Sequence, residues 1–148
     1  MTTALDFAGL SGLEALRAMF AMPEPPPNIG SFLGMRVERL EEGDVAFSLP
    51  TRPEYANPLG TLHGGICATL LDSVMACAVH SRLPAGVGYG TLELKVNYVR
   101  AVPADGGLIT AAGTTIHVGR STATAEGRVT DAEGRLVAHG TTTCMIYR

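Results

Sequence analysis

The stretch that most constrains the fold is a run of about fifteen residues, GICATLLDSVMACAV, over positions 65–79. Projected as a helix, it has almost no polar face, because only Thr69, Asp72 and Ser73 interrupt its apolar surface. A helix that is hydrophobic nearly all round is buried on most sides, yet this one is shorter than the ~20 residues that cross a bilayer. We therefore expect a β-sheet to curl around one central helix, with further apolar surface covering what the sheet leaves.

The sequence on either side of this helix has the residue pattern of β-strands. MRVERL over 35–40 and VAFSLP over 45–50 flank Glu41-Glu42-Gly43-Asp44, which is a good hairpin signal. After the helix, TLELKVNYV over 91–99 alternates apolar and polar residues with period two. Turn signals recur about once per dozen residues, which predicts one antiparallel sheet and an α+β fold, with four strands in a meander after the helix. The remaining strands are expected over 108–118, 122–130 and 135–147.

The N-terminal part of the chain differs from the rest. Apolar residues recur at helical spacing over 12–22, which predicts a short helix ended by Pro23, and Pro25-Pro26-Pro27 separates this helix from the remainder of the chain. We expect residues 1–28 to form a helical appendage with a proline-rich linker, and residues 29–148 to form one domain. The sequence leaves open whether the appendage packs on the core.

Composition points to a partner and excludes several functions. The chain has 148 residues, of which 46% are hydrophobic and 17% charged, enough for one domain. This is more apolar than a single particle of this size needs, so we expect part of its surface to face another subunit. The net charge is −3 and no basic cluster occurs, so we expect no nucleic-acid partner.

Cysteine usage and the N-terminus indicate a cytoplasmic protein. Cys67, Cys77 and Cys144 form no CxxC pair, which argues against a disulfide framework and a zinc knuckle. The chain begins without a basic signal region, and no apolar stretch reaches the ~18 residues of a membrane span. We expect a soluble, unprocessed protein with no membrane association.

Asp72 is the anomaly within the apolar helix. An ionised carboxylate taken out of water is costly unless it is paired or hydrogen-bonded, and no Lys or Arg lies within one helical turn of it. Asp72 could lie on a narrow solvated stripe, or Thr69 or Ser73 could cap its carboxylate. The functional interpretation is a base or nucleophile in a cleft, where perturbed carboxylates concentrate.

His63-Gly64-Gly65 stands where this helix begins. Free N–H groups and the positive end of the helix dipole favour a developing negative charge there, and two glycines would let a substrate approach the backbone. A glycine turn with an incidental histidine would have the same sequence.

The spacing of these two features predicts a shared site. Gly64 and Asp72 are eight residues apart, which is ~12 Å along a helix, whereas a reacting atom lies about 3 Å from both its attacker and its oxyanion donors. If both groups act in catalysis, the start of one subunit's helix must meet the middle of another's, in a dimer with two equivalent sites.

Together these residues resemble a known family. Asn57, then LHGG over 62–65, then Leu71-Asp72, the strand TLELKVNYVRAV over 91–102 and the ending GTTTCMIY over 140–147 are similar to the hotdog-fold thioesterases of the phenylacetate-degradation (PaaI-like) group. The ordered set N-x5-HGG-x6-D is more specific than HGG alone. The resemblance covers most of the chain but not the appendage.

The resemblance implies an acyl-CoA thioester hydrolase without a metal or redox cofactor. It implies that Asp72 activates or orients the attacking water, or attacks directly, and that the N–H of Gly64 polarises the thioester carbonyl. It further implies that Asn57 and His63 help to bind that carbonyl and that the hydroxyl of Thr91, at a position where a serine often stands, assists the carboxylate. Family members are dimers that often pair into tetramers, so we expect a homodimer or a dimer of dimers.

Coenzyme A carries phosphates, which should meet basic side chains at the rim of the pocket. Arg100, Arg120 and Arg82 are candidates in loop-like positions. The Gly119-Arg120-Ser121 turn is the best of them, because its backbone N–H groups could also approach a phosphate. Gly65 is expected to leave room for the bound substrate.

Two other functions remain open, because the hotdog fold also carries dehydratases or hydratases and non-catalytic acyl-CoA-binding proteins. A dehydratase would need a histidine working with a carboxylate, and His63 and Asp72 are ~12 Å apart within one chain, although a dimer could pair them. A sensor would more often come with a DNA-binding segment. The acyl group also stays open between aromatic, phenylacetyl-like and medium-chain groups.

Overall fold

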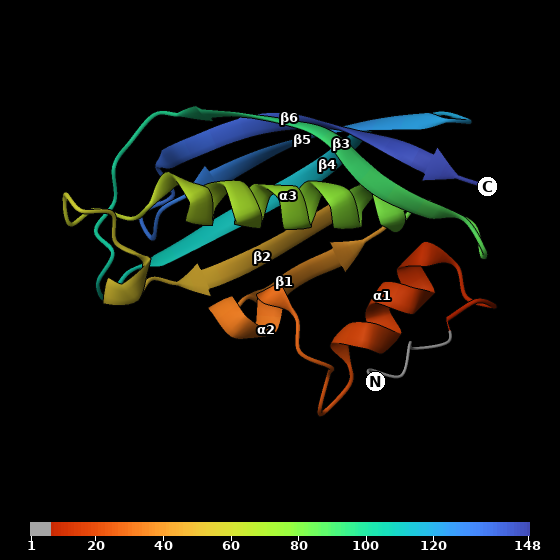
Figure 1. Ribbon diagram of the computed structural model, residues 1–148, viewed down its shortest axis with the longest axis horizontal. Coiled ribbons are helices and arrows are strands. Elements are labelled where there is room, and N and C mark those ends of the chain that lie inside the picture. Colours follow the sequence, from red (N-terminus) through yellow and green to blue (C-terminus); the bar gives the residue numbers. More distant parts are fainter. Residues whose placement is uncertain (1–6) are drawn as a thin grey trace.

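The apolar run of the sequence forms helix α3 (Gly64–His80) in the computed structural model, which describes residues 7–148. Figure 1 shows this helix lying along one face of a six-stranded antiparallel sheet. Leu70, Leu71 and Met75 on α3 are fully buried in the hydrophobic core. The predicted α+β class, with a sheet around one central helix, is confirmed, and the predicted helix is correct to within one residue at each end.

The strands follow the predicted runs closely. The strand order in the sheet is β1-β2-β4-β5-β6-β3, with antiparallel pairing throughout. The predicted hairpin joins β1 to β2, and its turn uses Gly43 at a φ of 74°, a conformation that glycine adopts without steric cost. A short 3-10 turn, η1 (Pro53–Tyr55), follows β2. The strands are β1 (Arg36–Glu41), β2 (Asp44–Pro50), β3 (Gly88–Tyr98), β4 (Leu108–Val118), β5 (Thr122–Thr130) and β6 (Leu136–Tyr147).

The predicted four-strand meander after the helix is wrong. β4, β5 and β6 are neighbours in sequence order, but β3 pairs with β6 and forms one edge of the sheet. The connection from β3 to β4 is a long segment that passes the start of α3, where the N–H of Leu62 donates to the carbonyl of Val102 at 2.9 Å. That contact carries the chain across the end of the sheet, so β3 and β4 do not form a hairpin.

Strand β3 contains a bulge that changes which side chains face the helix. Its pairing with β6 shifts between Thr91 and Glu93, so the period-two alternation of the sequence changes phase there. As a result Thr91 points to the helix side, whereas Leu92 is 54% exposed on the other side. The period-two alternation predicts Leu92 on the same face as Leu94 and Val96, and the bulge makes this part of the strand prediction wrong.

The N-terminal helix α1 (Gly12–Phe20) packs on the core. Its first residue lies so close to the end of α3 that a Cβ on Gly12 would be 1.7 Å from the carbonyl oxygen of His80, so only glycine fits. The N–H of Gly12 also donates to the carbonyl of Leu83 at 2.9 Å. At its other end, the Phe20 ring meets Phe47 of β2 edge to face at 5.4 Å.

The segment after α1 stays close to the same side of the molecule. Helix α2 (Ile29–Leu33) is capped by the side chain of Asn28 and ends at Gly34 in the left-handed conformation. Leu33 is buried in the core, and Figure 1 shows α1 and α2 together beside α3 and β1. The first six residues of the predicted 1–28 appendage lie outside the described residues.

Within residues 7–148, no helix is both long enough and apolar enough to cross a membrane. The apolar character of α3 is instead accounted for by its burial against the sheet.

Candidate active site

The start of α3 is fixed by its own capping residue. His63 is the N-cap, and its Nδ1 accepts the N–H of Gly65 at 2.8 Å. Because Nδ1 is an acceptor, the neutral ring carries its proton on Nε2, on the exposed side of the side chain. His63 can therefore donate to an acceptor outside the helix, as a carbonyl-binding role requires.

Asn57 closes the loop that leads into α3. Its Oδ1 accepts the N–H groups of Leu59 at 2.9 Å and Thr61 at 3.2 Å, and its Nδ2 donates to Thr61 Oγ1 at 2.9 Å. These bonds fix the loop that precedes His63, so Asn57 has a structural role. Its second Nδ2 hydrogen is not used by these bonds and is the part of the side chain that could serve a substrate.

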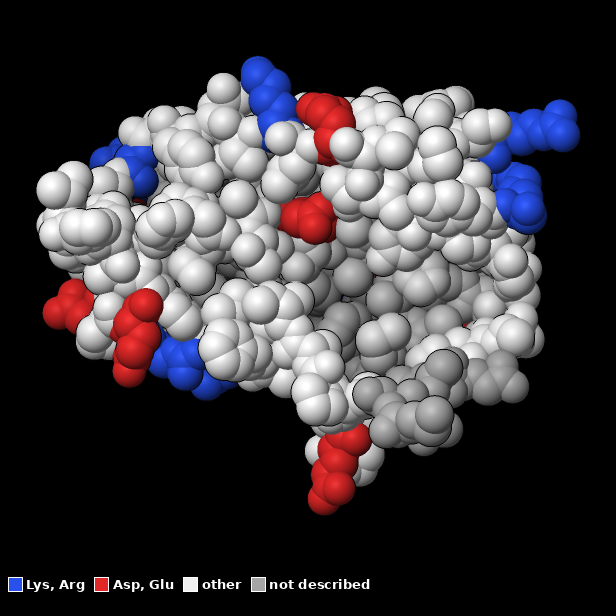
Figure 2. Space-filling view, viewed as in Figure 1, with Lys and Arg blue, Asp and Glu red and all other residues white. Residues whose placement is uncertain are grey.

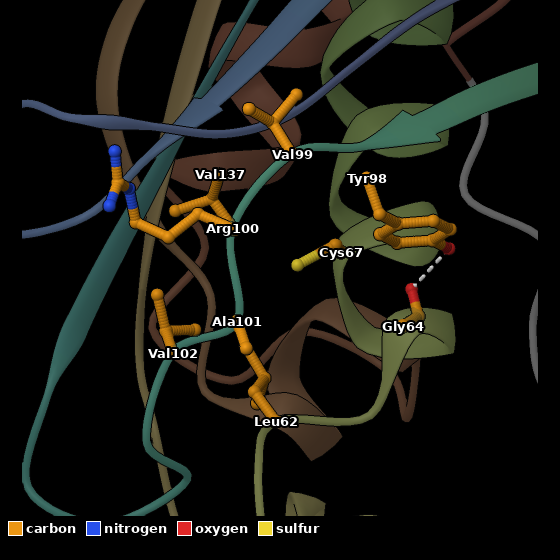
Figure 3. Close-up of a pocket in the computed structure, with 9 residues that line it drawn as sticks. All are labelled: Leu62, Gly64, Cys67, Tyr98, Val99, Arg100, Ala101, Val102 and Val137. Atoms are coloured by element: carbon orange, nitrogen blue, oxygen red, sulfur yellow. Dashed lines mark hydrogen bonds between the residues drawn. The ribbon is translucent and has the colours of Figure 1, made fainter.

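Tyr98 at the end of β3 holds the first turn of α3. Its hydroxyl donates to the carbonyl of Gly64 at 2.7 Å, and a Cβ on Gly64 would lie 3.0 Å from the tyrosine ring. Figure 3 shows the ring beside the first turn of α3, at the wall of a cavity of about 330 Å³. In the alternating run TLELKVNYV, Tyr98 stands as one of the apolar strand residues, and no pattern in the chain marks its contact with Gly64.

Asp72 lies near the middle of α3 and is only half-buried. Thr91 Oγ1 donates to Asp72 Oδ1 at 2.9 Å. Thr69 and Ser73 instead donate to helix carbonyls, those of Gly65 and Thr69, each at 2.8 Å. The alternative in which Thr69 or Ser73 caps the Asp72 carboxylate is therefore wrong, and the hydroxyl that reaches it comes from β3.

The surroundings of Asp72 are apolar and largely uncharged. It lies beside a groove of about 570 Å³ that also reaches Cys77 and Tyr89. Burial, and secondarily the Asp72 carboxylate, raises the pKa of the Cys77 thiol to about 12. Burial also raises the pKa of the Tyr89 hydroxyl, so both groups are neutral near pH 7.

The predicted coenzyme A residues separate into two groups. Arg100 lies at the start of α3, where it lines the same cavity as Gly64, and Figure 3 shows its side chain extending away from Gly64. Its N–H donates to the carbonyl of Val137 at the beginning of β6. The turn at 119–121 is tied to the other end of β6, where Ser121 accepts the N–H of Ile146. Nine residues of strand, ~30 Å, separate Val137 from Ile146.

The Gly119-Arg120-Ser121 turn shares its end of the sheet with Thr91. Ala123 pairs with Cys144, and Cys144 pairs with Thr91. The N–H of Gly119 donates to the carbonyl of Thr122 at 2.8 Å, so this N–H is already used. Arg120 is exposed.

Arg82 serves the fold at the far end of α3. Its Nε lies 3.9 Å from Glu42 Oε1, and its Nη1 lies 3.5 Å from Thr115 Oγ1. Its guanidinium thus contacts the β1–β2 turn and β4.

One chain therefore holds two half-sites. The starting half-site consists of His63, Gly64 and Gly65 with Tyr98, and the middle half-site consists of Asp72 with Thr91. They lie eight helical residues apart, ~12 Å.

Across residues 7–148, no group of three or more His, Cys, Asp or Glu side chains is placed to hold a metal ion.

Comparison with known proteins identifies the class. Residues 59–138, which contain both half-sites, match the thioesterase superfamily. A 1,4-dihydroxy-2-naphthoyl-CoA hydrolase from Listeria monocytogenes is 30% identical over 71% of this chain and 84% of its own length. A hypothetical thioesterase with coenzyme A from Streptococcus pneumoniae is 28% identical, with a TM-score of 0.70 over 76% of this chain and 85% of that one.

The fold has an independent counterpart. The PaaI protein from the phenylacetic acid degradation operon of Escherichia coli superposes with a TM-score of 0.81 over 95% of this chain and 96% of that one, and at 18% identity this likeness shows the hotdog fold alone. Fold and sequence together define a hotdog-fold enzyme that hydrolyses thioesters. The chain belongs to the thioesterase superfamily, as its resemblance predicted.

Proposed function

We propose that this enzyme hydrolyses an acyl-CoA thioester at a site in which Asp72 supplies the base and the start of α3 binds the carbonyl oxygen. The observation that carries the proposal is the 2.9 Å hydrogen bond from Thr91 to Asp72 in the middle of an otherwise apolar helix. A hydroxyl donor fixes one carboxylate oxygen and leaves the other lone pairs free to accept a proton.

The reaction needs only these groups. Asp72 takes a proton from water as the water oxygen attacks the carbonyl carbon, the carbon–sulfur bond breaks, and coenzyme A leaves as the thiol after it receives that proton. Direct attack by Asp72, followed by hydrolysis of the anhydride, is the alternative route to the same products. The N–H of Gly64 stabilises the negative charge that develops on the carbonyl oxygen, and His63 adds a donor from its Nε2. No metal or redox cofactor takes part in either route.

The proposed active unit is a dimer, alone or paired into a tetramer. Strand β3 is an edge strand with Leu92 and Tyr98 about half exposed, at 54% and 55%, and such an edge is suited to pairing with another chain. If two copies of β3 pair in antiparallel fashion about a centre at Lys95, the extra residue of the bulge places Thr91 of one subunit opposite Tyr98 of the partner subunit. This register would join the starting half-site of each subunit to the middle half-site of the other.

The same register supports two roles for the basic residues. The turn at 119–121 lies on the side of the middle half-site, and Arg100 lies beside the starting half-site. A dimer would bring both to one substrate, with Arg120 and Ser121 facing the phosphates and Gly65 leaving room for the thioester. The relative from L. monocytogenes, named as an aryl-CoA hydrolase, supports an aromatic acyl group, and medium-chain groups fit the same chemistry.

The test is release of free thiol from a panel of acyl-CoAs, with and without a chelator. We expect turnover of at least one aryl-CoA or medium-chain acyl-CoA, unaffected by the chelator. Asp72→Asn should lower kcat by ~10² or more, since it removes the base while nearly keeping the volume. Asp105→Asn, at an exposed position away from both half-sites, is the matched control and should keep wild-type activity. An Asp72→Asn variant that retains most of its activity would contradict the assignment.

A further inference from the structure

The groove beside Asp72 has walls from two different parts of the chain. One wall is made by α3 and β3, with Ala76, Cys77 and Tyr89. The other, the N-terminal wall, consists of Met19, Phe20, Ile29 and Met35. Figure 2 shows the hollow on this face, with Lys and Arg side chains confined to the periphery.

The N-terminal wall is held in place before any substrate binds. Gly12 is bonded to Leu83 at the end of α3, and Phe20 packs edge to face on Phe47. Leu33, at the end of α2, is buried in the core. The groove is therefore a preformed feature of the fold, as small-molecule sites usually are.

The chemistry of the groove suits a neutral apolar group. Its volume of about 570 Å³ lies within the ~300–1,000 Å³ of typical ligand pockets. Cys77 and Tyr89 stay neutral because burial raises their pKa values, and Phe20 and Ile29 expose apolar surface into the groove. Arg36 is the basic residue along the groove, and it is exposed on β1.

Asp72 sets the position of the thioester relative to this groove. A carbonyl carbon within reach of Asp72 has two further substituents, the sulfur of coenzyme A and the acyl group. Coenzyme A is large and charged and must extend to solvent, whereas the acyl group is small and apolar. Asp72 lines the groove, which supplies apolar surface for the acyl group.

We propose that this groove binds the acyl group and that the N-terminal wall sets the length of acyl group that the enzyme accepts. The inference rests on the proposed function. The N-terminal wall lies outside residues 59–138, which match the thioesterase superfamily, so the length limit would come from a segment separate from the one that holds Asp72.

The experiment compares kcat/KM for acetyl-CoA, octanoyl-CoA and phenylacetyl-CoA in variants of helix α2. Ile29 lines the groove and is 54% exposed, whereas Phe32 on the same helix is 75% exposed and does not line the groove. Ile29→Trp narrows the groove and Ile29→Ala widens it, while Phe32→Ala removes a similar apolar surface elsewhere. Thermal unfolding of each variant checks that the fold is kept.

Ile29→Trp should lower the octanoyl-to-acetyl and phenylacetyl-to-acetyl ratios of kcat/KM by about tenfold or more, because one methylene in a hydrophobic pocket changes kcat/KM by roughly 10–200-fold. Ile29→Ala should shift the preferred acyl length upward. Phe32→Ala should leave both ratios within about twofold of wild type. If the tryptophan variant does not fold, Ile29→Ala carries the test, because it only removes exposed surface.

Two results would overturn the inference. Either both Ile29 variants keep the wild-type ratios, or Phe32→Ala changes them as much as the Ile29 variants do. Failure of the proposed function is a different outcome, because the wild-type enzyme would then turn over no thioester, or its turnover would not depend on Asp72. An enzyme that depends on Asp72 but has unchanged ratios places the acyl group elsewhere, in contact with the partner subunit.

Discussion

The starting and middle half-sites lie on one helix but present different chemical groups. The starting half-site offers backbone N–H groups, which are present at the start of every helix. Its glycines only allow a substrate to approach these groups. The middle half-site offers a carboxylate, which must be brought into an apolar helix and held there by the Thr91 hydroxyl. Strand β3 contacts both, with Tyr98 at Gly64 and Thr91 at Asp72. One strand thus fixes the positions of two groups that lie ~12 Å apart on the helix.

The largest effect is expected when one chain of a dimer carries a defective starting half-site and the other chain carries a defective middle half-site. Asp72→Asn is co-expressed with the double variant Asn57→Ala, His63→Ala, and we expect each to be nearly inactive alone. Half of the dimers in a random mixture are heterodimers, and each of these has one intact site of two, so activity should return from background to about a quarter of the wild-type level. Heterodimers that form but remain inactive would place the whole site within one chain.

The middle half-site is tested next by its hydroxyl. Thr91→Val should lower kcat about tenfold with KM little changed, because it removes a hydrogen bond to a charged group. Thr91→Ser restores the hydroxyl and should stay within about twofold of wild type. Thr91→Val should also fail to complement Asp72→Asn, since both defects lie in the same half-site, and complementation between them would separate Thr91 from Asp72.

A smaller effect is expected at the starting half-site. Tyr98→Phe removes a neutral hydrogen bond to the Gly64 carbonyl and should lower kcat a few-fold, as expected of a positioning residue. Tyr147→Phe, exposed at the end of β6, is the control and should have no effect. Unlike Thr91→Val, Tyr98→Phe should restore wild-type turnover at the intact sites when it is mixed with Asp72→Asn, a difference that steady-state rates of the mixtures detect.

The smallest effect concerns stability at the far end of α3, away from both half-sites. Burial lowers the pKa of His80 below its ordinary value of 6.5, so the folded protein favours the neutral ring. Its contribution to stability is present above pH 6.5 and is lost as the pH falls through the folded pKa. Denaturant unfolding of His80→Gln between pH 7.5 and 5 should therefore show a flatter decline than wild type, with kcat at pH 7.5 unchanged. An equally steep decline would assign the acid sensitivity to other groups.

Much of the fold was predictable because it follows from local patterns. The central helix is visible in its unbroken apolar surface, and the β1–β2 hairpin in its turn residues, since both signals lie within short stretches of chain. The pairing of β3 with β6 was not predictable, because it joins strands that are far apart in the sequence. Turn spacing records where strands end but not which strands become neighbours.

The candidate site was predictable in its residue types and less so in their contacts. Asp72 stood out because a carboxylate is costly in an apolar helix, and the ~12 Å spacing from Gly64 followed from helix geometry alone. The contacts of Tyr98 with Gly64 and of the N-terminal wall with the groove are tertiary, and nothing in the sequence near these residues indicates them. The link from Thr91 to Asp72 came from family resemblance, because regular alternation in β3 would have turned Thr91 away from the helix.

The bulge in β3 has a consequence for how such a gene can change. Because Leu92 is the extra residue between Thr91 and Glu93, loss of its codon would leave Thr91 and Glu93 adjacent and opposite adjacent residues of β6, so regular pairing would return with every remaining side chain on its present face. The Thr91 hydroxyl would stay on the helix side, beside Asp72, and the edge strand could still form. Lineages of this chain should therefore tolerate loss of Leu92 better than loss of a residue between Leu94 and Tyr98, which would turn one part of the strand to the opposite face, and a homologue that lacks the Leu92 codon is expected to keep the hydroxyl partner of its aspartate.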